Sequence, residues 1–378
     1  MPSITLVEFE LKKKLYSCGL LRTILLLSTV LFIGSAVRIL ANYKEKLLDW
    51  RSVDDVLKDN SLDNCQTQHR HYATETLPRG IVSETSDLER KPLWGHHEKN
   101  STKARNILAM AVGIKQKKNV DIIVNKFLSS ESDFVLMLFH YDGIVDEWKD
   151  LEWSDEAIHI VAVNQTKWWF AKRFLHPDIV PEYDYIFLWD EDLGLDNFHP
   201  GRYLSIIKEE GLEISQPGLD SRKSQVHHQL TKRQKGSRVH RRINWKIGKT
   251  NCDKNVTGPP CSGFVEMMAP VFSKASWRCT WYMIQNNLVH GWGVDFQLGY
   301  CAQGDPTKNV GIVDSEYIIH YGTPTLGGSA TNKTQPLSEQ SNAREKVRRW
   351  SFVELSIFRN RWRKAAENDD CWNDIYKQ

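Results

Sequence analysis

The sequence predicts an α/β fold in which helices flank a mainly parallel sheet. From residue 105 onward, short apolar runs alternate with segments of helical spacing, which is typical of parallel sheets. The chain has 378 residues, 41% hydrophobic and 26% charged; this globular composition excludes collagen-like and wholly disordered classes. A formal net charge of +3 gives no strong field for nucleic acid, and no nucleic-acid partner is expected.

Each predicted element rests on its own run of sequence. Strands are expected where apolar residues follow one another almost without a break, and helices where they recur every three or four positions. The predicted strands are Asn106–Val112, Phe134–His140, Ile158–Val163 and Tyr185–Trp189, and the predicted helices are Lys117–Leu128, Trp168–Leu175 and Val347–Ala366. The last helix is basic and amphipathic, and we expect it to dock onto the domain.

The N-terminal segment predicts a membrane anchor. A lysine cluster at 12–14 precedes a long uncharged stretch between Arg22 and Arg38. About 20 apolar residues span a bilayer as a helix, and lysines on the N-terminal side favour a cytosolic N-terminus. We therefore expect a cytosolic tail (1–14) and a transmembrane signal anchor (15–40), which give a single-pass type II membrane protein. A cleaved signal peptide is the alternative.

The rest of the chain divides into three segments. Residues 41–103 are polar and weakly patterned, as expected of a luminal stem, residues 104–325 carry the main domain, and residues 326–378 hold a linker and the C-terminal helix. The cysteines and the Asn-x-Ser/Thr sequons of the luminal part fit a glycoprotein on a secretory route. Cys252–Cys261 and Cys279–Cys301 are candidate local disulfides, but the spacing leaves other pairings open.

The triplet Asp190-Glu191-Asp192 is the first candidate for chemistry, because it directly follows an apolar strand. Side chains alternate along a strand, so Asp190 and Asp192 should point to one side of its end and Glu191 to the other. Two carboxylates at that point can hold Mg²⁺ or Mn²⁺, which in turn holds a diphosphate. A helix N-cap or a solvated turn is the alternative.

A second cluster is Trp292-Gly293-Val294-Asp295. Gly293 allows close approach of a ligand and Trp292 offers a flat face to a sugar, so both are expected to bind the acceptor. A carboxylate at Asp295 can deprotonate a hydroxyl group, and Asp295 is our candidate catalytic base; a helix N-cap is the alternative. Glu266 is expected to bind acceptor hydroxyls, unless its segment packs in the core.

Five further polar residues complete the candidate site. His320 ends an apolar run and offers a nitrogen ligand for a metal, although a lone histidine is more often structural. Lys167, Lys172 and Arg173 belong to a helical segment, where they either contact the phosphates of a donor or face solvent. Asp142 follows the second strand and either contacts the donor's nucleoside or shapes a turn.

Residues 221–250 carry ten Lys or Arg residues and no acid. A solvated loop is the first interpretation, and a surface for an anionic ligand or lipid headgroups is the second. The sequence has no GxxxxGK[ST] loop, no HExxH and no GxSxG, so nothing in it supports a kinase or an α/β-hydrolase.

In their order along residues 104–325, the motifs resemble the glycosyltransferase-A fold: a strand ending in Asp-x-Asp, a Gly-containing loop, an acid at a helix start, and a late His. The resemblance implies that Asp190, Asp192 and His320 hold Mn²⁺ (or Mg²⁺). It also implies a nucleotide-diphosphate sugar as the donor, and Asp295 as the base if the enzyme inverts configuration.

A second resemblance spans nearly the whole body. The segments NILAMAVGIKQKKNVD, YDYIFLWDEDLG and HGWGVDFQLGYCAQGD are similar to those of a plant family labelled "lysine ketoglutarate reductase trans-splicing related". That label brings no established activity, and the sequence lacks the dinucleotide fingerprint that would support a reductase.

The leading functional hypothesis is a Golgi membrane glycosyltransferase that moves a sugar from a nucleotide-diphosphate sugar to a glycan hydroxyl in the lumen. The basic segment 221–250 would suit an acidic polysaccharide as its partner. The alternative is a non-catalytic, membrane-anchored carbohydrate-binding or scaffold protein of the same fold. A third hypothesis is a metal-dependent phosphotransferase or hydrolase.

Overall fold

The computed structural model describes residues 70, 72–83, 105–129, 133–244, 246–247, 250–253, 256–323 and 337–377. They belong to one compact unit, Arg70–Gln378. The predicted cytosolic tail (1–14), the predicted anchor (15–40) and most of the predicted stem (41–103) lie outside the described residues. Within the part that is described, no helix has both the length and the apolar character to cross a bilayer.

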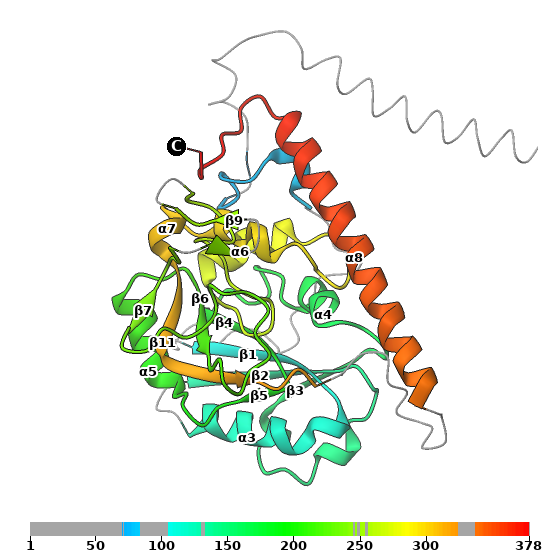
Figure 1. The fold of residues 1–378 in the computed structure, drawn as a ribbon. Helices are drawn as coiled ribbons and strands as arrows, with labels where there is room; N and C mark the ends of the chain where they lie inside the picture. The colour runs from blue at the N-terminus through cyan, green and yellow to red at the C-terminus, as the bar shows by residue number, and fades with distance from the viewer. Residues whose placement is uncertain are drawn as a thin grey trace, which may run out of the picture. The chain divides into compact units, whose positions relative to one another are not determined.

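One nine-stranded sheet organises the described part of the unit (Figure 1). Its order is β3-β2-β1-β4-β10-β6-β11-β5, and β7 also pairs with β11. The strands are β1 (Arg105–Val112), β2 (Asp133–His140), β3 (Ile158–Val161), β4 (Tyr183–Asp190), β5 (Leu193–Gly194), β6 (Ile214–Leu219), β7 (Val239–His240), β10 (Val271–Ser273) and β11 (Val310–His320). Two more short strands, β8 (Lys246–Ile247) and β9 (Thr250–Asn251), pair with each other.

The sheet is mixed rather than mainly parallel, which corrects the prediction. Strands β3, β2, β1 and β4 are parallel neighbours, as the alternation of strands and helices predicted. β10 then pairs antiparallel with both β4 and β6, and β5 and β7 pair antiparallel with β11. β5, β7 and β10 are only two or three residues long, too short for a periodicity that sequence analysis can recognise.

Helices cover both faces of the sheet (Figure 1). α3 and α5 pack on one face, and α4 and α6 pack on the other. The helices are α3 (Lys117–Leu128), α4 (Lys167–Phe174), α5 (Pro200–Glu209), α6 (Lys274–Met283), α7 (Pro306–Asn309) and α8 (Leu337–Glu367), with short 3₁₀ helices η1 (Arg79–Ile81), η2 (Ile114–Gln116), η3 (Asp146–Trp148), η4 (Ser154–Glu156) and η5 (Asp295–Cys301). The predicted helices 117–128, 168–175 and 347–366 are confirmed as α3, α4 and part of α8.

The alternation of side chains along β1 explains how one sheet supports two cores. Ile107 and Ala109 belong to the core under α4 and α6, whereas Leu108, Met110 and Val112 belong to the core under α3 and α5. Successive side chains of a strand point to opposite faces, so a continuous apolar run fills both cores. This is why the strand reads as an unbroken apolar segment rather than as an alternating one.

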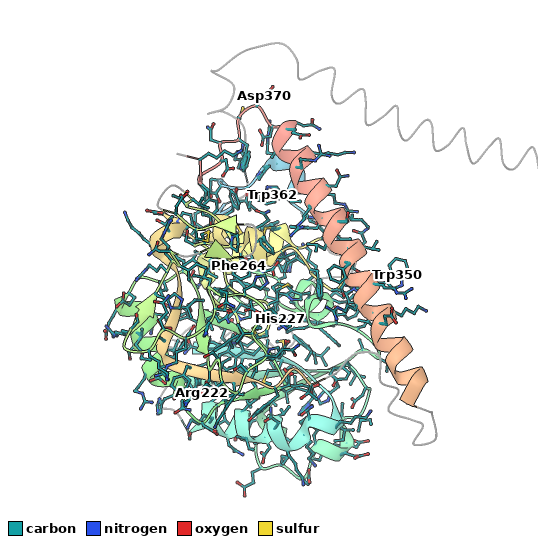
Figure 2. The ribbon with its side chains drawn as sticks, in the orientation of Figure 1. Arg222, His227, Phe264, Trp350, Trp362 and Asp370 are labelled. Atoms are coloured by element: carbon teal, nitrogen blue, oxygen red, sulfur yellow. A yellow bond between two sulfur atoms is a disulfide. The ribbon has the colours of Figure 1, made fainter. Side chains whose placement is uncertain are left out.

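α8 docks along one side of the unit, as predicted (Figure 1). Its residues Phe358, Trp362 and Ala365 are buried, and the Trp362 ring lies 4.8 Å from the ring of Tyr300. Figure 2 shows Trp350 on the outer side of the same helix, where 55% of the side chain is exposed. One face of α8 is therefore part of the core, and the opposite face is not.

The folded unit includes residues that the sequence assigned to the stem. Leu77 and Ile81 are buried, and η1 contacts α8. Arg70 and Arg79 each bind the carboxylate of Asp369, at 3.2 Å. Because these contacts join segments about 300 residues apart, local sequence pattern could not show them.

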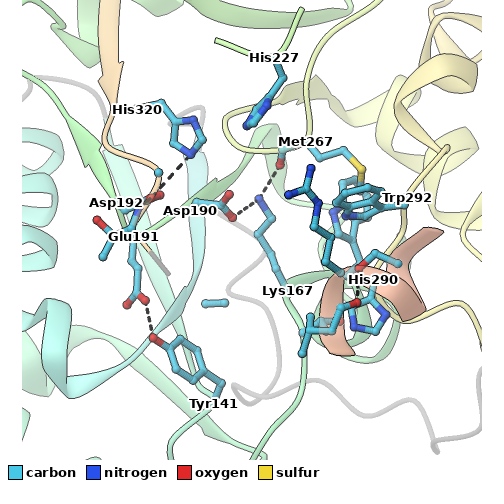
Figure 3. Close-up of a pocket in the computed structure, with 18 of the residues that line it drawn as sticks. Tyr141, Lys167, Asp190, Glu191, Asp192, His227, Met267, His290, Trp292 and His320 are labelled. Atoms are coloured by element: carbon cyan, nitrogen blue, oxygen red, sulfur yellow. Dashed lines mark hydrogen bonds and ion pairs between the residues drawn. The ribbon is translucent and has the colours of Figure 1, made fainter. Parts of the chain in front are cut away.

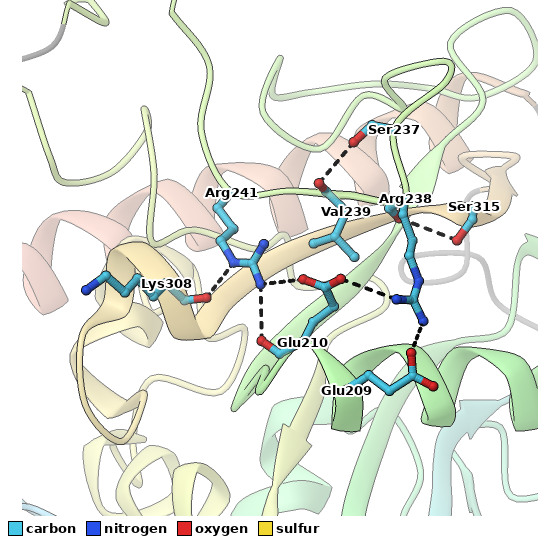
Figure 4. Close-up of polar contacts among 8 residues, drawn as sticks. All are labelled: Glu209, Glu210, Ser237, Arg238, Val239, Arg241, Lys308 and Ser315. Carbon is cyan, nitrogen blue, oxygen red and sulfur yellow. Dashed lines mark hydrogen bonds and ion pairs between the residues drawn. The ribbon is translucent and has the colours of Figure 1, made fainter.

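Disulfides and ion pairs tie the second half of the unit together. Both candidate disulfides, Cys252–Cys261 and Cys279–Cys301, are present. Part of the basic charge in residues 221–250 is neutralised inside the molecule: Figure 4 shows Arg238 bound to Glu209, at the end of α5, and to Glu210, which follows it. Arg241 donates to the carboxylate of Glu210 at 2.9 Å. These arginines therefore hold the segment against α5, which weakens its interpretation as an anion-binding surface.

Candidate active-site pocket

A pocket of about 450 Å³ lies beyond the end of β4 (Figure 3), where open α/β sheets usually bind ligands. Two of its sides differ in chemistry. The acidic wall is formed by Asp190, Glu191, Asp192 and His320. The helix wall is formed by Val347, Arg348 and Ser351 of α8 together with His290 and Trp292 of the loop between α6 and η5. Lys167, at the start of α4, lies between them (Figure 3).

Strand pairing brings the predicted metal ligands together. β5 pairs antiparallel with the end of β11, so that Leu193 lies opposite His320. Asp192 precedes Leu193, and its carbonyl and carboxylate accept hydrogen bonds from the backbone N–H groups of Tyr321 (3.1 Å) and Thr323 (2.7 Å). As a result, His320 Nε2 lies 3.6 Å from Asp192 Oδ2, although 128 residues separate the two in sequence.

The hydrogen bond at the other ring nitrogen of His320 fixes its tautomer. His320 Nδ1 lies 3.1 Å from the carbonyl oxygen of Gln225; a carbonyl can only accept, so Nδ1 carries the proton. In the neutral imidazole, Nε2 is then the nitrogen whose lone pair can bind a cation. Metal-binding histidines are commonly held by such a carbonyl contact.

Asp190 is engaged by Lys167. The Lys167 ammonium group lies 2.6 Å from Asp190 Oδ1 and donates to the carbonyl oxygens of Met267 (2.6 Å) and Leu188 (3.2 Å). Burial lowers the pKa of Lys167, while the adjacent charge of Asp190 opposes that shift,. Three acceptors match the three donors of an ammonium group. A lysine at a helix start is unfavourable for the helix dipole, and Asp190 compensates for it.

The Glu191 side chain points away from those of Asp190 and Asp192, as the alternation along the strand predicted. Its carboxylate accepts hydrogen bonds from the backbone N–H of Gly113, at 2.7 Å, and from the hydroxyl of Tyr141. Burial raises the pKa of Glu191 to about 8. Burial, and then the charge of Asp190, also raise the pKa of Asp192. The neighbouring carboxylates of Asp190 and Asp192 repel each other when both are charged, which favours a bound cation at this strand end,.

The helix wall depends on two glycines. Gly291 and Gly293 have φ angles of 69° and 96°, a region that other residues rarely adopt. A Cβ atom on Gly293 would lie 2.7 Å from Leu355 of α8, so this glycine allows the loop to pack closely against the helix. Gly293 was predicted to contact the acceptor; its close contact is with α8. Trp292, which was predicted to bind the acceptor, lines the pocket.

His290 and Glu354 form a hydrogen-bonded pair on the helix wall. One oxygen of the Glu354 carboxylate accepts from the backbone N–H of His290 and the other from its Nδ1, each at 2.8 Å. Glu354 comes from α8, 64 residues away in sequence. Because the carboxylate accepts from Nδ1, Nε2 is the other, proton-accepting nitrogen. A histidine oriented by a carboxylate in a pocket is a typical general base.

Two predicted residues lie close to each other but do not line the pocket. Asp295 begins η5 and accepts a hydrogen bond from the backbone N–H of Phe296 at 3.0 Å. Burial raises the pKa of Asp295 to about 6. Glu266 is buried, and its carboxylate accepts from the hydroxyl of Thr231. Burial, opposed by this bond, raises the pKa of Glu266 to about 8, and the charge of Asp295 contributes.

Three residues predicted to bind the donor have structural contacts instead. Lys172 is buried, and its ammonium group donates to the carbonyls of Trp281 (2.8 Å) and Ser83 (3.1 Å). The guanidinium of Arg173 lies 3.9 Å from the ring centroid of Trp169. The carboxylate of Asp142 accepts from two backbone N–H groups in the turns that follow β1 and β2, which matches the turn role left open by the sequence.

The residues of the acidic wall fit a divalent cation. Within the described residues, no three His, Cys, Asp or Glu side chains form a ready-made metal site. Mg²⁺ and Mn²⁺ sites in phosphate-binding proteins, however, commonly use one or two carboxylates and complete their shell with substrate phosphates and water. Asp192 and the free Nε2 of His320 supply two such ligands, and Asp190 provides a third if it leaves Lys167.

Sequence reasoning did not single out His290, Glu354 or Arg348, which belong to the helix wall and its hydrogen bonds. Two local signals pointed to His290 and Glu354. His290 directly precedes the Gly-Trp-Gly turn that was singled out for Trp292, and Glu354 is the one acid between residues 346 and 366. An isolated acid in a basic amphipathic helix indicates a specific partner, but the sequence does not name that partner.

Comparisons with solved structures found only distant likeness. The glycosyltransferase GlyE of Streptococcus pneumoniae TIGR4 is 10% identical, with a TM-score of 0.33 over 69% of this chain and 64% of GlyE. TarS 1–349 of S. aureus is 7% identical, with a TM-score of 0.35 over 56% and 59%. Glucosyl-3-phosphoglycerate synthase of Mycobacterium tuberculosis, solved with Mn²⁺ and UDP-glucose, is 10% identical, with a TM-score of 0.33 over 68% and 81%.

This chain spans less than two thirds of the length of GlyE and of TarS 1–349. No curated protein matches the sequence. The comparisons do not support the plant origin or the reductase-related label of the second resemblance. One family does match, over residues 68–368, which is most of the chain and includes both walls of the pocket. The chain therefore belongs to the family described as "Protein of unknown function (DUF707)".

Proposed function

We propose that this chain is a metal-dependent glycosyltransferase with a glycosyltransferase-A-like domain, which moves a sugar from a nucleoside-diphosphate sugar to a hydroxyl group of a glycan. One observation carries the proposal: strand pairing brings Asp192 Oδ2 and His320 Nε2 within 3.6 Å of each other, beside Asp190, in a pocket of about 450 Å³. That volume lies within the range of small-molecule and cofactor sites.

Asp192 and His320 would hold the divalent cation, which would supply positive charge to a departing diphosphate. Lys167, which is paired with Asp190, adds a second positive charge between the walls. Glu191 and Tyr141 brace the strand end that carries both aspartates. The acidic wall therefore serves the donor.

The acceptor hydroxyl would lose its proton to His290. As the hydroxyl oxygen forms its bond to the anomeric carbon, His290 Nε2 takes the proton and the bond to the diphosphate oxygen breaks. Glu354 holds the histidine in this tautomer and stabilises the imidazolium that forms. His290 suits this role better than the sequence-based candidate Asp295, because it lines the pocket and Asp295 does not.

The sequence also supports a location for this activity. Residues 15–40 have the apolar length of a signal anchor,, so the domain would face the lumen of the Golgi apparatus on a single-pass type II membrane protein. Protease treatment of sealed microsomes should leave the C-terminus intact. Digestion of the C-terminus without detergent would contradict this topology.

The decisive experiment measures Mn²⁺ and UDP binding to the full chain by calorimetry. Asp192→Asn should abolish Mn²⁺-dependent UDP binding, because loss of a ligand costs more than the roughly 10- to 100-fold that supporting residues contribute. Asp196→Asn is the matched control: Asp196 is exposed and lies four residues further along the chain. Equal Mn²⁺ and UDP affinities in wild type and Asp192→Asn would overturn the metal site.

A second candidate function is glycan binding without turnover. It is favoured by the contact between Lys167 and Asp190 at 2.6 Å, which occupies one of the two acids with a protein cation. A chain of this kind would bind glycan but neither Mn²⁺ nor UDP. Hydrolysis or transfer from any nucleotide sugar, dependent on Mn²⁺, would exclude it.

A further inference from the structure

The helix wall carries a charge that nothing in the described part of the chain neutralises. Arg348 lines the pocket but forms no ion pair with any described residue, whereas its neighbour Arg349 binds Glu345 at 2.6 Å. The acids nearest along α8 are also occupied, since Glu345 holds Arg349 and Glu354 holds His290. Arg348 is therefore available to an anion in the pocket.

Two exposed aromatic rings lie beside this arginine. Phe352 follows Arg348 by one helical turn, and the guanidinium lies 5.9 Å from its ring centroid. The rings of Phe352 and Trp292 meet edge to face, with centroids 5.0 Å apart. The side chains are 50% and 36% exposed. Large aromatic groups that stay exposed at the edge of a pocket commonly mark a binding surface.

The arrangement suits a sugar ring that carries a carboxylate. The C–H faces of a pyranose are apolar and pack on aromatic rings, while a guanidinium group binds a carboxylate through two parallel hydrogen bonds. A bare phosphate would use the arginine but gain nothing from the rings.

We propose that Trp292, Phe352 and Arg348 form the acceptor-binding surface and that the acceptor is an acidic glycan, a chain of uronic acid residues. This proposal rests on the proposed function, since it assigns the acceptor of that same site. It assigns the acidic polysaccharide to α8 and not to the basic segment 221–250, where Arg238 and Arg241 are paired with acids. The two walls then serve the two substrates, with the metal and the diphosphate at one and the acidic sugar at the other.

The test compares two trisaccharides by calorimetry on the full chain, without donor or metal: tri-galacturonic acid and its methyl ester, which keeps the rings but removes the charge. Wild type should bind the acid at least tenfold more tightly. Arg348→Ala should reduce the affinity for the acid to that for the ester. Arg349→Ala, which removes the same charge one position away, should change it less than twofold.

The aromatic contribution is measured with a second pair of variants. Phe352→Ala should weaken binding of both trisaccharides by a similar factor, because the ring packs on the sugar and not on the carboxylate. Trp350→Ala, on the outer side of the same helix, should leave both affinities unchanged. Equal effects of the two substitutions would overturn the assignment of the surface.

Three further results would contradict the inference. These are no binding of the acidic trisaccharide by wild type, equal affinity for acid and ester, and a loss of Mn²⁺-dependent UDP affinity in Arg348→Ala with glycan affinity unchanged. The last result would assign Arg348 to the donor phosphates. Failure of the proposed function gives a different result. If the chain binds the acidic glycan at this surface but binds neither UDP nor Mn²⁺, the glycan-binding proposal holds and the glycosyltransferase proposal is wrong.

Discussion

The acidic wall and the helix wall of the pocket are built by different means. The acidic wall is positioned by hydrogen-bonded strand ends. Asp190 is the last residue of β4, and the pairing of β5 with β11 places His320 beside Asp192. The helix wall stands on the packing of α8, whose buried residues Phe358 and Trp362 reach the core. Backbone pairing fixes positions through many short bonds, whereas side-chain packing fixes them through a few large contacts.

A change in conditions or in sequence should displace one wall more than the other. Paired strand ends resist displacement because every backbone group would lose a partner. A docked helix can shift when one anchor is lost, since its own hydrogen bonds remain intact. We therefore expect the helix wall to be the more adjustable part of the site.

Removing the main anchor of α8 should have the largest effect. Trp362→Ala should lower the free energy of unfolding by about 3–5 kcal/mol, the usual cost of deleting a buried tryptophan. Trp350→Ala, 55% exposed on the same helix, should change it by no more than about 0.5 kcal/mol. Urea denaturation followed by circular dichroism measures both. Equal effects of the two variants would show that α8 is not anchored through this face.

Acidification should destabilise the fold through a buried histidine at the end of β2. His140 ends β2, is fully buried, and lies 2.7 Å from His159. Burial, and then the charge of His159, lower the pKa of His140 to about 4, while the charge of Asp142 opposes that shift. Between the ordinary histidine pKa of 6.5 and about 4, the unfolded chain binds the proton more readily. The free energy of unfolding should therefore fall as the pH falls through this window, by up to about 3 kcal/mol.

His140→Gln isolates this contribution. The variant keeps a polar side chain but does not titrate, so its stability should fall less steeply from pH 6.5 to pH 4 than that of wild type. Urea titrations at several pH values measure the slope for both proteins. An identical slope would mean that other groups, His228 among them, dominate the acid response.

Removing the carboxylate that orients His290 should have a smaller effect. It should lower the rate of sugar transfer and leave the donor affinity unchanged. Glu354→Gln removes the negative charge that orients His290, so sugar transfer should slow by about tenfold or more, a fraction of what a general base contributes. Mn²⁺ and UDP affinity should stay the same, because those ligands belong to the other wall. Glu345→Gln, exposed on the same helix, is the control. An unchanged rate in Glu354→Gln would remove this pair from the mechanism.

The smallest effect is expected at Asp190. Its carboxylate is 39% exposed and already paired with Lys167, so Asp190→Asn should weaken Mn²⁺ binding only a few fold, far less than Asp192→Asn. Calorimetric titration of Mn²⁺ into the two variants gives the ratio directly. If both substitutions cost the same, Asp190 is a full metal ligand and its contact with Lys167 gives way when the metal binds.

Local pattern predicted more of the acidic wall than of the helix wall. The apolar run before Asp190 fixed the position of the triplet at a strand end, and the alternation of side chains predicted the separate direction of Glu191. The meeting of His320 with Asp192 agrees with the resemblance to glycosyltransferases, but it depends on β5, which has only two residues. On the helix wall, only Trp292 was recognised in advance.

The misplaced candidates share one cause. Lys172, Arg173, Asp142 and Glu266 are polar residues near predicted strands or helices, and such residues suit a ligand site and a buried hydrogen bond equally well. Their partners are backbone carbonyls, backbone amides, a tryptophan ring and a threonine hydroxyl. Only three-dimensional proximity distinguishes these roles, because each partner lies outside the local pattern that a sequence segment shows.

The sequence by itself determined the parallel half of the sheet, the helices α3 and α4 and the strand-end acids, because these depend on periodicity and alternation within short segments. It also marked the two disulfides as candidates but left other pairings open. Only the tertiary structure decided that the sheet is mixed, that residues 72–83 join the unit, and that Glu354 orients His290. It also decided that Arg348 remains unpaired among the described residues. Contacts between distant segments depend on how whole elements pack, and the free energy of that packing is a property of the assembled core.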